Sequence, residues 1–127
     1  MRLMHAGLVS SSERRAERFF GGVLGFEQTR RSQLSAELGK SLFGFDEGCE
    51  ILYYGGGDLE LEVFVTGRPE VVEGKISHLC LEVVDRDQVL ARCAELGFAV
   101  RRAPKADYVV VFIADEDGNL FEIKEKR

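Results

Sequence analysis

A chain of 127 residues, 45% hydrophobic and 31% charged, can bury a core without disulfides or a structural metal. Its 22 acidic and 17 basic residues are interspersed and give a net charge of −5, which disfavours binding to nucleic acid or to an anionic membrane. No apolar run approaches the roughly 18 residues of a membrane span, and the N-terminus lacks the features of a secretory signal. Cys49, Cys80 and Cys93 have no CxxC spacing, which is typical of free thiols in a reducing compartment, by default the cytoplasm.

The chain contains an internal duplication. Placing MHAGLVSSSERRAERFFGGVLGFEQ over SHLCLEVVDRDQVLARCAELGFAV aligns His5 with His78 and brings the LGF at 24–26 onto the LGF at 96–98. This offset is too long for a solenoid repeat and suits a duplicated half-domain. We therefore expect one domain, residues 1–127, built of two modules, about 1–67 and about 75–127.

The first module begins with a predicted strand at about residues 2–9, where His5 lies on the face opposite Met4, Ala6 and Leu8. A helix follows the capping cluster SSSE and ends at Gly25. SAELGKSLFGF predicts a short helix, and GGGD predicts a hairpin turn rather than a phosphate loop. The further strands of this module are predicted near 26–33, 48–54 and 58–65.

The second module repeats this pattern. Leu79, Leu81 and Val83 form the apolar face of its first strand, which leaves His78 and Cys80 opposite. Its helix is predicted to begin at Asp85 or Asp87 and to end at Gly97, and its remaining strands to lie near 98–103, 107–114 and 118–125. The pattern predicts an α+β fold: two tandem βαβββ modules forming a cupped mixed sheet, with helices on its outer face.

Each module also carries carboxylates on its last strand. Glu122 lies between Phe121 and Ile123, and Glu60 and Glu62 alternate with apolar residues in DLELEVFV. Both histidines and these glutamates thus occupy the faces that do not pack against helices. If the modules pair as a cup, two imidazoles and two carboxylates can converge on one divalent ion such as Zn, Ni, Co, Fe or Mn. The alternative is that the histidines are hydrogen-bonded structural residues and the glutamates are solvated.

The segments HAGL…FF…VLGF and SHLCLEV…LGF…VVFIADEDGNLFEI resemble the vicinal-oxygen-chelate superfamily over nearly the whole chain. This superfamily includes glyoxalase I, extradiol dioxygenases, methylmalonyl-CoA epimerase, and the fosfomycin and bleomycin resistance proteins. Among these the chain looks most like bacterial glyoxalase I, and this resemblance implies the metal ligands His5, Glu60, His78 and Glu122. Glu60 is preferred because it is flanked by apolar residues as Glu122 is, and Glu62 remains a rival.

The resemblance implies a metal-dependent lyase or isomerase that acts on a small substrate with two adjacent oxygens through an enediolate, with Glu122 and Glu60 as catalytic proton carriers. Glyoxalase I holds glutathione with an arginine and an asparagine where this chain has Val9 and Phe64, which cannot make those polar contacts. Lactoylglutathione lyase activity is therefore not implied. The candidate residues for substrate contacts are Tyr53, Tyr54, Phe64, Arg101, Tyr108 and Phe112.

Two other functions are compatible with the same residues. One is a metal-free ligand-binding or sequestering protein of the bleomycin-resistance type. The other is a non-haem Fe(II) dioxygenase that uses His5 or His78 with Glu122. Members of this superfamily commonly dimerise, so we expect a homodimer, with the site either inside one chain or shared between two.

Overall fold

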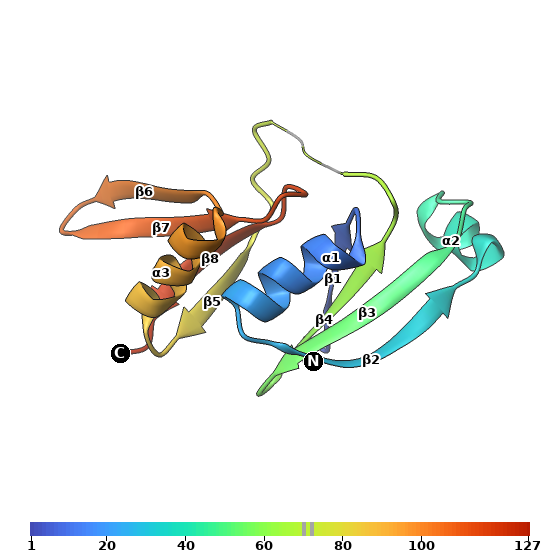
Figure 1. The fold of residues 1–127 in the computed structure, drawn as a ribbon, viewed down its shortest axis with the longest axis horizontal. Helices are drawn as coiled ribbons and strands as arrows, with labels where there is room; N and C mark the ends of the chain where they lie inside the picture. The colour runs from blue at the N-terminus through green and yellow to red at the C-terminus, as the bar shows by residue number, and fades with distance from the viewer. Residues whose placement is uncertain (70, 72) are drawn as a thin grey trace.

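The chain folds into two four-stranded sheets (Figure 1). The computed structural model describes residues 1–69, 71 and 73–127. In each sheet the first strand pairs in parallel with the last, and the other pairs are antiparallel. The first sheet has the order β1 (Ala6–Ser10), β4 (Leu59–Val65), β3 (Cys49–Gly56), β2 (Glu27–Leu34). The second has the order β5 (Leu79–Val83), β8 (Leu120–Glu125), β7 (Tyr108–Ala114), β6 (Val100–Lys105). The predicted α+β fold of two βαβββ modules is confirmed.

Local capping signals explain where the helices begin and end. In the first module, α1 (Glu13–Ala16) continues into the π-helical segment η1 (Glu17–Val23), and the Ser12 side chain accepts a hydrogen bond from the Arg15 amide. In the second, α3 (Arg86–Leu96) is capped by Asp85 and stops at Gly97, whose φ of 81° favours glycine. The predicted short helix is also present, as α2 (Ala36–Phe43). None of the helices in the described part of the chain has the length and apolar character needed to span a bilayer.

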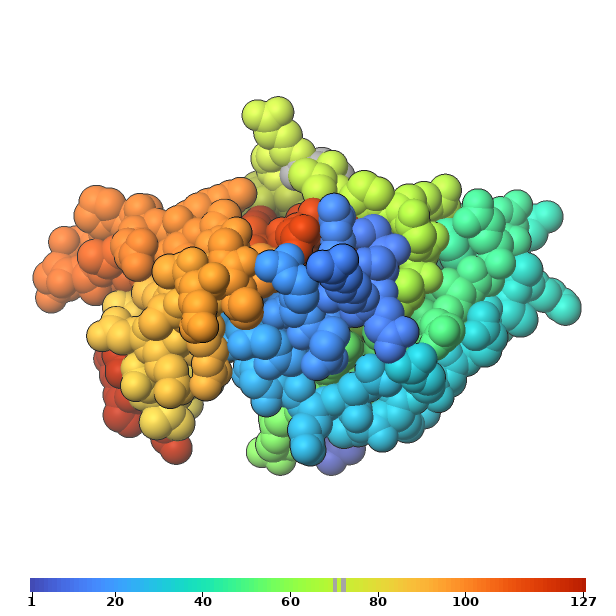
Figure 2. Space-filling model, in the orientation of Figure 1, coloured from blue at the N-terminus to red at the C-terminus, as the bar shows by residue number. Residues whose placement is uncertain are grey.

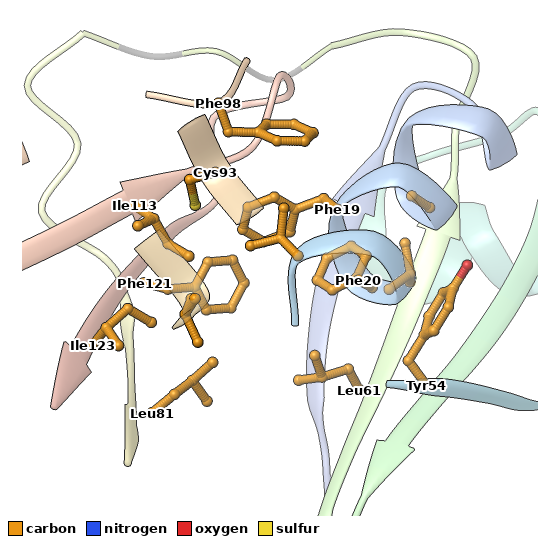
Figure 3. Close-up of a cluster of buried hydrophobic side chains, with 14 of the residues drawn as sticks. Phe19, Phe20, Tyr54, Leu61, Leu81, Cys93, Phe98, Ile113, Phe121 and Ile123 are labelled. Atoms are coloured by element: carbon orange, nitrogen blue, oxygen red, sulfur yellow. The ribbon is translucent and has the colours of Figure 1, made fainter. Parts of the chain in front are cut away.

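One hydrophobic core joins the two modules. Phe19 and Phe20 of η1 lie between apolar side chains of both sheets (Figure 3). The Phe19 ring centroid lies 5.3 Å from that of Phe98 and 5.3 Å from that of Phe121, whereas Phe20 lies 5.4 Å from Tyr54 of the first sheet. In the first module, η1 packs against α3 of the second (Figure 2). Because each sheet turns its apolar face towards this shared core, the opposite face of each sheet points away from it.

Tyr54, one of the candidates for a substrate contact, belongs to this core instead. The side chain is buried, and its hydroxyl donates a hydrogen bond to Glu17 Oε2 at 2.9 Å. Burial, followed by the bond to Glu17, raises the pKa of the Tyr54 phenol well above its usual range. Neighbouring residues of a strand point to opposite faces, so one of Tyr53 and Tyr54 must face the core. The sequence does not show which one, because both are aromatic.

The Tyr54→Phe variant tests the contribution of this hydroxyl. We expect it to lose about 1 kcal/mol of unfolding free energy, because one hydrogen bond disappears while the ring stays buried. Urea denaturation followed by circular dichroism measures the change. Tyr108→Phe is the matched control, since Tyr108 is 51% exposed. Equal stability of the two variants would show that the Tyr54–Glu17 bond contributes nothing.

A second connection between the modules is polar. The turn that joins β7 to β8 lies against the end of β1, where Asn119 Nδ2 donates to the Val9 carbonyl at 2.8 Å. In the same turn, Asp117 accepts hydrogen bonds from Ser10 Oγ at 3.2 Å and from the Ser11 amide at 3.0 Å. Arg15 Nη1 completes the set at 2.9 Å from Asp117 Oδ1. Together with the aromatic core, these bonds fix the orientation of one module relative to the other.

Candidate metal centre

In the second module, His78 and Glu122 lie side by side. His78 directly precedes β5, and its Nδ1 lies 2.7 Å from the Ile76 carbonyl, a contact that assigns the ring proton to Nδ1. In the neutral ring this leaves the lone pair on Nε2, which lies 3.8 Å from Glu122 Oε2. Two ligand bonds of about 2.1 Å each span that separation, so a single ion can touch both atoms. The Phe112 ring packs against the His78 imidazole, with the two ring centroids 4.8 Å apart.

The first module has the equivalent pair, His5 and Glu62. His5 directly precedes β1, and its Nε2 contacts Glu62 Oε2. Strand register shows that the two pairs are equivalent: Glu62 lies opposite Gly7 in β1, as Glu122 lies opposite Cys80 in β5. In both modules the opposing residue is therefore two positions after the histidine. We call His5 with Glu62 half-site one, and His78 with Glu122 half-site two.

The sequence favoured Glu60 over Glu62 as the ligand, because of the apolar residues that flank it. In the structure Glu60 lies two residues before Glu62 on β4. It lies opposite Gly55 of β3, and its carboxylate is 45% exposed, 4.0 Å from Arg30 Nη2. The Glu62 side chain is only 14% exposed. The geometry therefore favours Glu62 over Glu60 as the counterpart of Glu122.

The two half-sites do not meet within one chain. Among residues 1–69, 71 and 73–127, no three His, Cys, Asp or Glu side chains come close enough together to hold one metal ion. The structure thus brings His5 to Glu62 and His78 to Glu122, but it does not join the two pairs. The cause is the shared core, which lies between the sheets and leaves each half-site on the side of its sheet that faces away from it.

Around half-site two, the remaining neighbours are polar and partly exposed. Cys80 shares a face with Glu122, as the alternation of β5 predicts, and its side chain is exposed. Burial, and then the negative charge of Glu122, raise the pKa of the Cys80 thiol, so it is neutral at pH 7. Lys124 Nζ lies 3.9 Å from Glu122 Oε1. Arg101, opposite Phe112 in the register, is exposed on the same face.

Further along the sheet face that carries half-site one lies a cavity of about 360 Å³, whose lining begins at Gly7, the residue opposite Glu62. Val9 and Phe64, which lie on the same faces of β1 and β4 as His5 and Glu62, form part of its wall. Phe43 of α2 packs edge-on against Phe64, with ring centroids 5.5 Å apart, and adds a second aromatic ring to the cavity wall. Sequence reasoning identified Phe64 but missed this wall, although the apolar LFGF at the end of α2 was a signal for it.

Comparison with known families decides the identity of the fold. Residues 2–123 match the family model described as Glyoxalase/Bleomycin resistance protein/Dioxygenase superfamily. The chain belongs to this superfamily. The resemblance drawn from the duplicated segments is thereby confirmed, and membership of the superfamily accounts for the two βαβββ modules. The sequence matches no curated protein.

Solved structures of the superfamily share the fold at low sequence identity. The fosfomycin resistance protein FosX from Mesorhizobium loti is 18% identical, with a TM-score of 0.70, over 97% of this chain and 90% of that chain. FosX from Listeria monocytogenes, in a complex with Mn(II) and a sulfate ion, is 14% identical, with a TM-score of 0.74, over 99% of this chain and 90% of that one. A glyoxalase family protein from Enterococcus faecalis is 22% identical, with a TM-score of 0.70, over 96% and 95%. These likenesses establish the architecture of the chain.

Proposed function

We propose that the protein is a metal-dependent enzyme whose divalent cation is held by half-site one of one subunit and half-site two of a second. His5 and Glu62 would act with His78 and Glu122 of the partner subunit. The observation that carries the proposal is the equivalence of the two pairs in strand register. Two imidazole nitrogens and two carboxylate oxygens suit Zn, Ni, Co, Fe or Mn, whereas Mg and Ca prefer oxygen ligands alone.

A homodimer supplies what one chain lacks. Each half-site offers only two protein ligands, and a stable site for these metals needs three or four. The sheet face that carries half-site two is open in the single chain, where Tyr108 is 51% exposed and Phe112 is half-buried. A twofold axis that brings this face over half-site one of the partner creates two identical sites, because the interface is the same seen from either subunit.

The activity we propose is that of a lyase or isomerase acting on a small substrate with two adjacent oxygens. The ion, when bound, would polarise the oxygens of the substrate. In this proposal Glu122 and Glu62 would take a proton from the neighbouring carbon and return it. We assign to Glu62 the role predicted for Glu60, because Glu62 contacts His5 whereas Glu60 faces Arg30. The hydrogen bond to the Ile76 carbonyl holds the His78 ring in one orientation.

The structural neighbours support metal use and leave the reaction open. FosX from Listeria monocytogenes was crystallised with Mn(II), which shows that a protein of this fold takes a divalent ion. Glutathione is not part of our proposal, because Val9 and Phe64 line an apolar cavity. A metal-free binding protein is the second candidate, favoured by that cavity alone.

The Glu62→Gln and Glu60→Gln pair tests the proposal. We expect Glu62→Gln to lower the affinity for Zn or Mn about tenfold or more, because an amide is a much weaker ligand than a carboxylate, and Glu60→Gln to leave the affinity unchanged. Protein purified without a His tag or chelator, analysed for bound metal and titrated by calorimetry, provides the measurement. Folded wild-type protein that takes up none of the five cations would instead support the metal-free binding protein.

The state of the three cysteines bears on the cellular compartment of the protein. Cys49 and Cys93 are buried and Cys80 is exposed, and all three are free. An exposed free thiol persists in a reducing environment and is oxidised outside the cell. We propose a cytoplasmic protein on this basis.

A further inference from the structure

We infer that the cavity beside half-site one binds the apolar, aromatic-sized arm of a substrate that ends in a carboxylate or a similar anion. The inference rests on the proposed function for the role of the ligand as a substrate, but the cavity and its charge can be tested without metal. Three features carry it: the position of the cavity on the sheet face that carries half-site one, the apolar side chains of its wall, and the guanidinium of Arg68 at its far end.

The cavity continues the face on which half-site one lies. Glu62 and Phe64 of β4, and Thr66 directly after it, follow one another at two-residue steps, and Phe64 and Thr66 line the cavity. At about 3.3 Å per residue, Glu62 and Thr66 are about 13 Å apart along the strand. A ligand that reaches from half-site one into this space is therefore a small molecule, extended along β4.

Most of the cavity wall is made of apolar side chains. The cavity volume of about 360 Å³ is at the small end of the range for ligand pockets, about 300–1,000 Å³. Cys49, which is buried, adds no charge, because burial raises the pKa of its thiol. Gly7 leaves room at the end nearest half-site one, where an added Cβ would lie 3.5 Å from the Phe64 ring. The apolar side chains of the wall are Leu8, Val9, Leu34, Phe43, Phe45 and Phe64.

Among the described residues that line the cavity, Arg68 is the charged one, and it lies at the end away from Glu62. Its guanidinium lies over the Phe45 ring, 4.9 Å from the centroid. The Thr66 hydroxyl bonds to the Arg68 carbonyl at 2.9 Å, and the Arg68 amide donates to the same hydroxyl at 3.4 Å. The stacking on Phe45 and the hydrogen bonds of this turn hold the planar Arg68 guanidinium at the rim of the cavity. The N–H groups of a guanidinium can donate two parallel hydrogen bonds to a carboxylate or phosphonate.

Phenylacetate and its uncharged isostere phenylacetamide test the inference on the folded wild-type protein. We expect phenylacetate to bind about fivefold more tightly, because only the anion pairs with Arg68. Backbone amide shifts in a two-dimensional NMR titration should change around Val9, Phe45 and Phe64. The Arg68→Gln variant should remove the preference while keeping the binding of phenylacetamide, and Val9→Phe, which fills the cavity, should weaken both ligands.

Controls separate this inference from the metal proposal. His5→Ala should lose metal and keep its affinity for phenylacetate, so failure of the metal site leaves the cavity result intact. Arg68 is exposed, so Arg68→Gln keeps the test valid should Val9→Phe fail to fold. Equal affinity of wild-type protein for the two ligands, or no shifts at the cavity residues, would overturn the inference. Persistence of the preference in Arg68→Gln would overturn it as well.

Discussion

His5→Ala and His78→Ala chains, unfolded and refolded together, are expected to bind metal although neither binds it alone. In the dimer we propose, each site takes one half from each subunit. A mixed dimer therefore collects both substitutions in one site and leaves the other site with all four ligands intact. With random pairing, half of the dimers are mixed, so about a quarter of the wild-type metal sites should return. Metal analysis of the refolded, gel-filtered mixture measures the recovery.

The matched control is a mixture of His5→Ala with Glu62→Gln. Both substitutions lie in half-site one, so every site in every dimer contains one of them and no intact site can form. We expect no recovery in this mixture. If both mixtures form dimers and neither regains metal, the four residues do not share a site across two subunits. Activity on a hemithioacetal of methylglyoxal, if the wild type shows any, should return to the same fraction as the metal.

The duplication explains why so much of the fold could be predicted. Helix ends depend on local residues such as Asp85 and Gly97, and strand positions on alternation, so these elements lie within a few residues of their predicted bounds. His5 and His78 were identified because they occupy equivalent positions in the two modules. These signals are all contained in short segments of the chain.

Long-range pairing could not be predicted in the same way. The choice between Glu60 and Glu62 depends on which of them β1 brings next to His5, and flanking residues carry no information about that register. The separation of the two half-sites depends on Phe19 and Phe20 packing between the sheets, whereas the sequence shows only that they belong to a core. The wall that α2 adds to the cavity is likewise a tertiary contact.

The turn between β7 and β8 is the clearest case of a role that the sequence hides. DEDGN predicts a hairpin, but not that Asp117 reaches back to the first module. Its side chain is only 1% exposed and accepts hydrogen bonds from Ser10, Ser11 and Arg15. A carboxylate buried in that position is stable only while these partners are present.

Asp117→Ala is therefore expected to lower the unfolding free energy by about 3 kcal/mol, because it removes the acceptor of three hydrogen bonds, from Ser10, Ser11 and Arg15, at about 1 kcal/mol each. Glu116→Gln is the matched control. Glu116 is the neighbouring residue and pairs with Arg15 and Arg18, but its side chain is 37% exposed, so we expect a loss below about 1 kcal/mol. Urea denaturation at pH 7 compares the two variants. Losses of similar size would mean that the buried bonds of Asp117 contribute no more than a surface ion pair.

The pH dependence of the Asp117→Ala effect gives an independent test. Burial by itself raises the pKa of Asp117, but the hydrogen bonds from Ser11, Arg15 and Ser10 outweigh it and hold the pKa below the ordinary 3.8. A carboxyl with a lowered pKa in the folded state stabilises that state fully above its unfolded pKa, and this contribution is lost as the pH falls through the folded pKa. The stability difference between wild type and Asp117→Ala should thus be constant from about pH 7 to pH 5 and should shrink below about pH 4. A difference that stayed constant down to pH 2 would assign the effect to lost packing, with no part for the charge of Asp117.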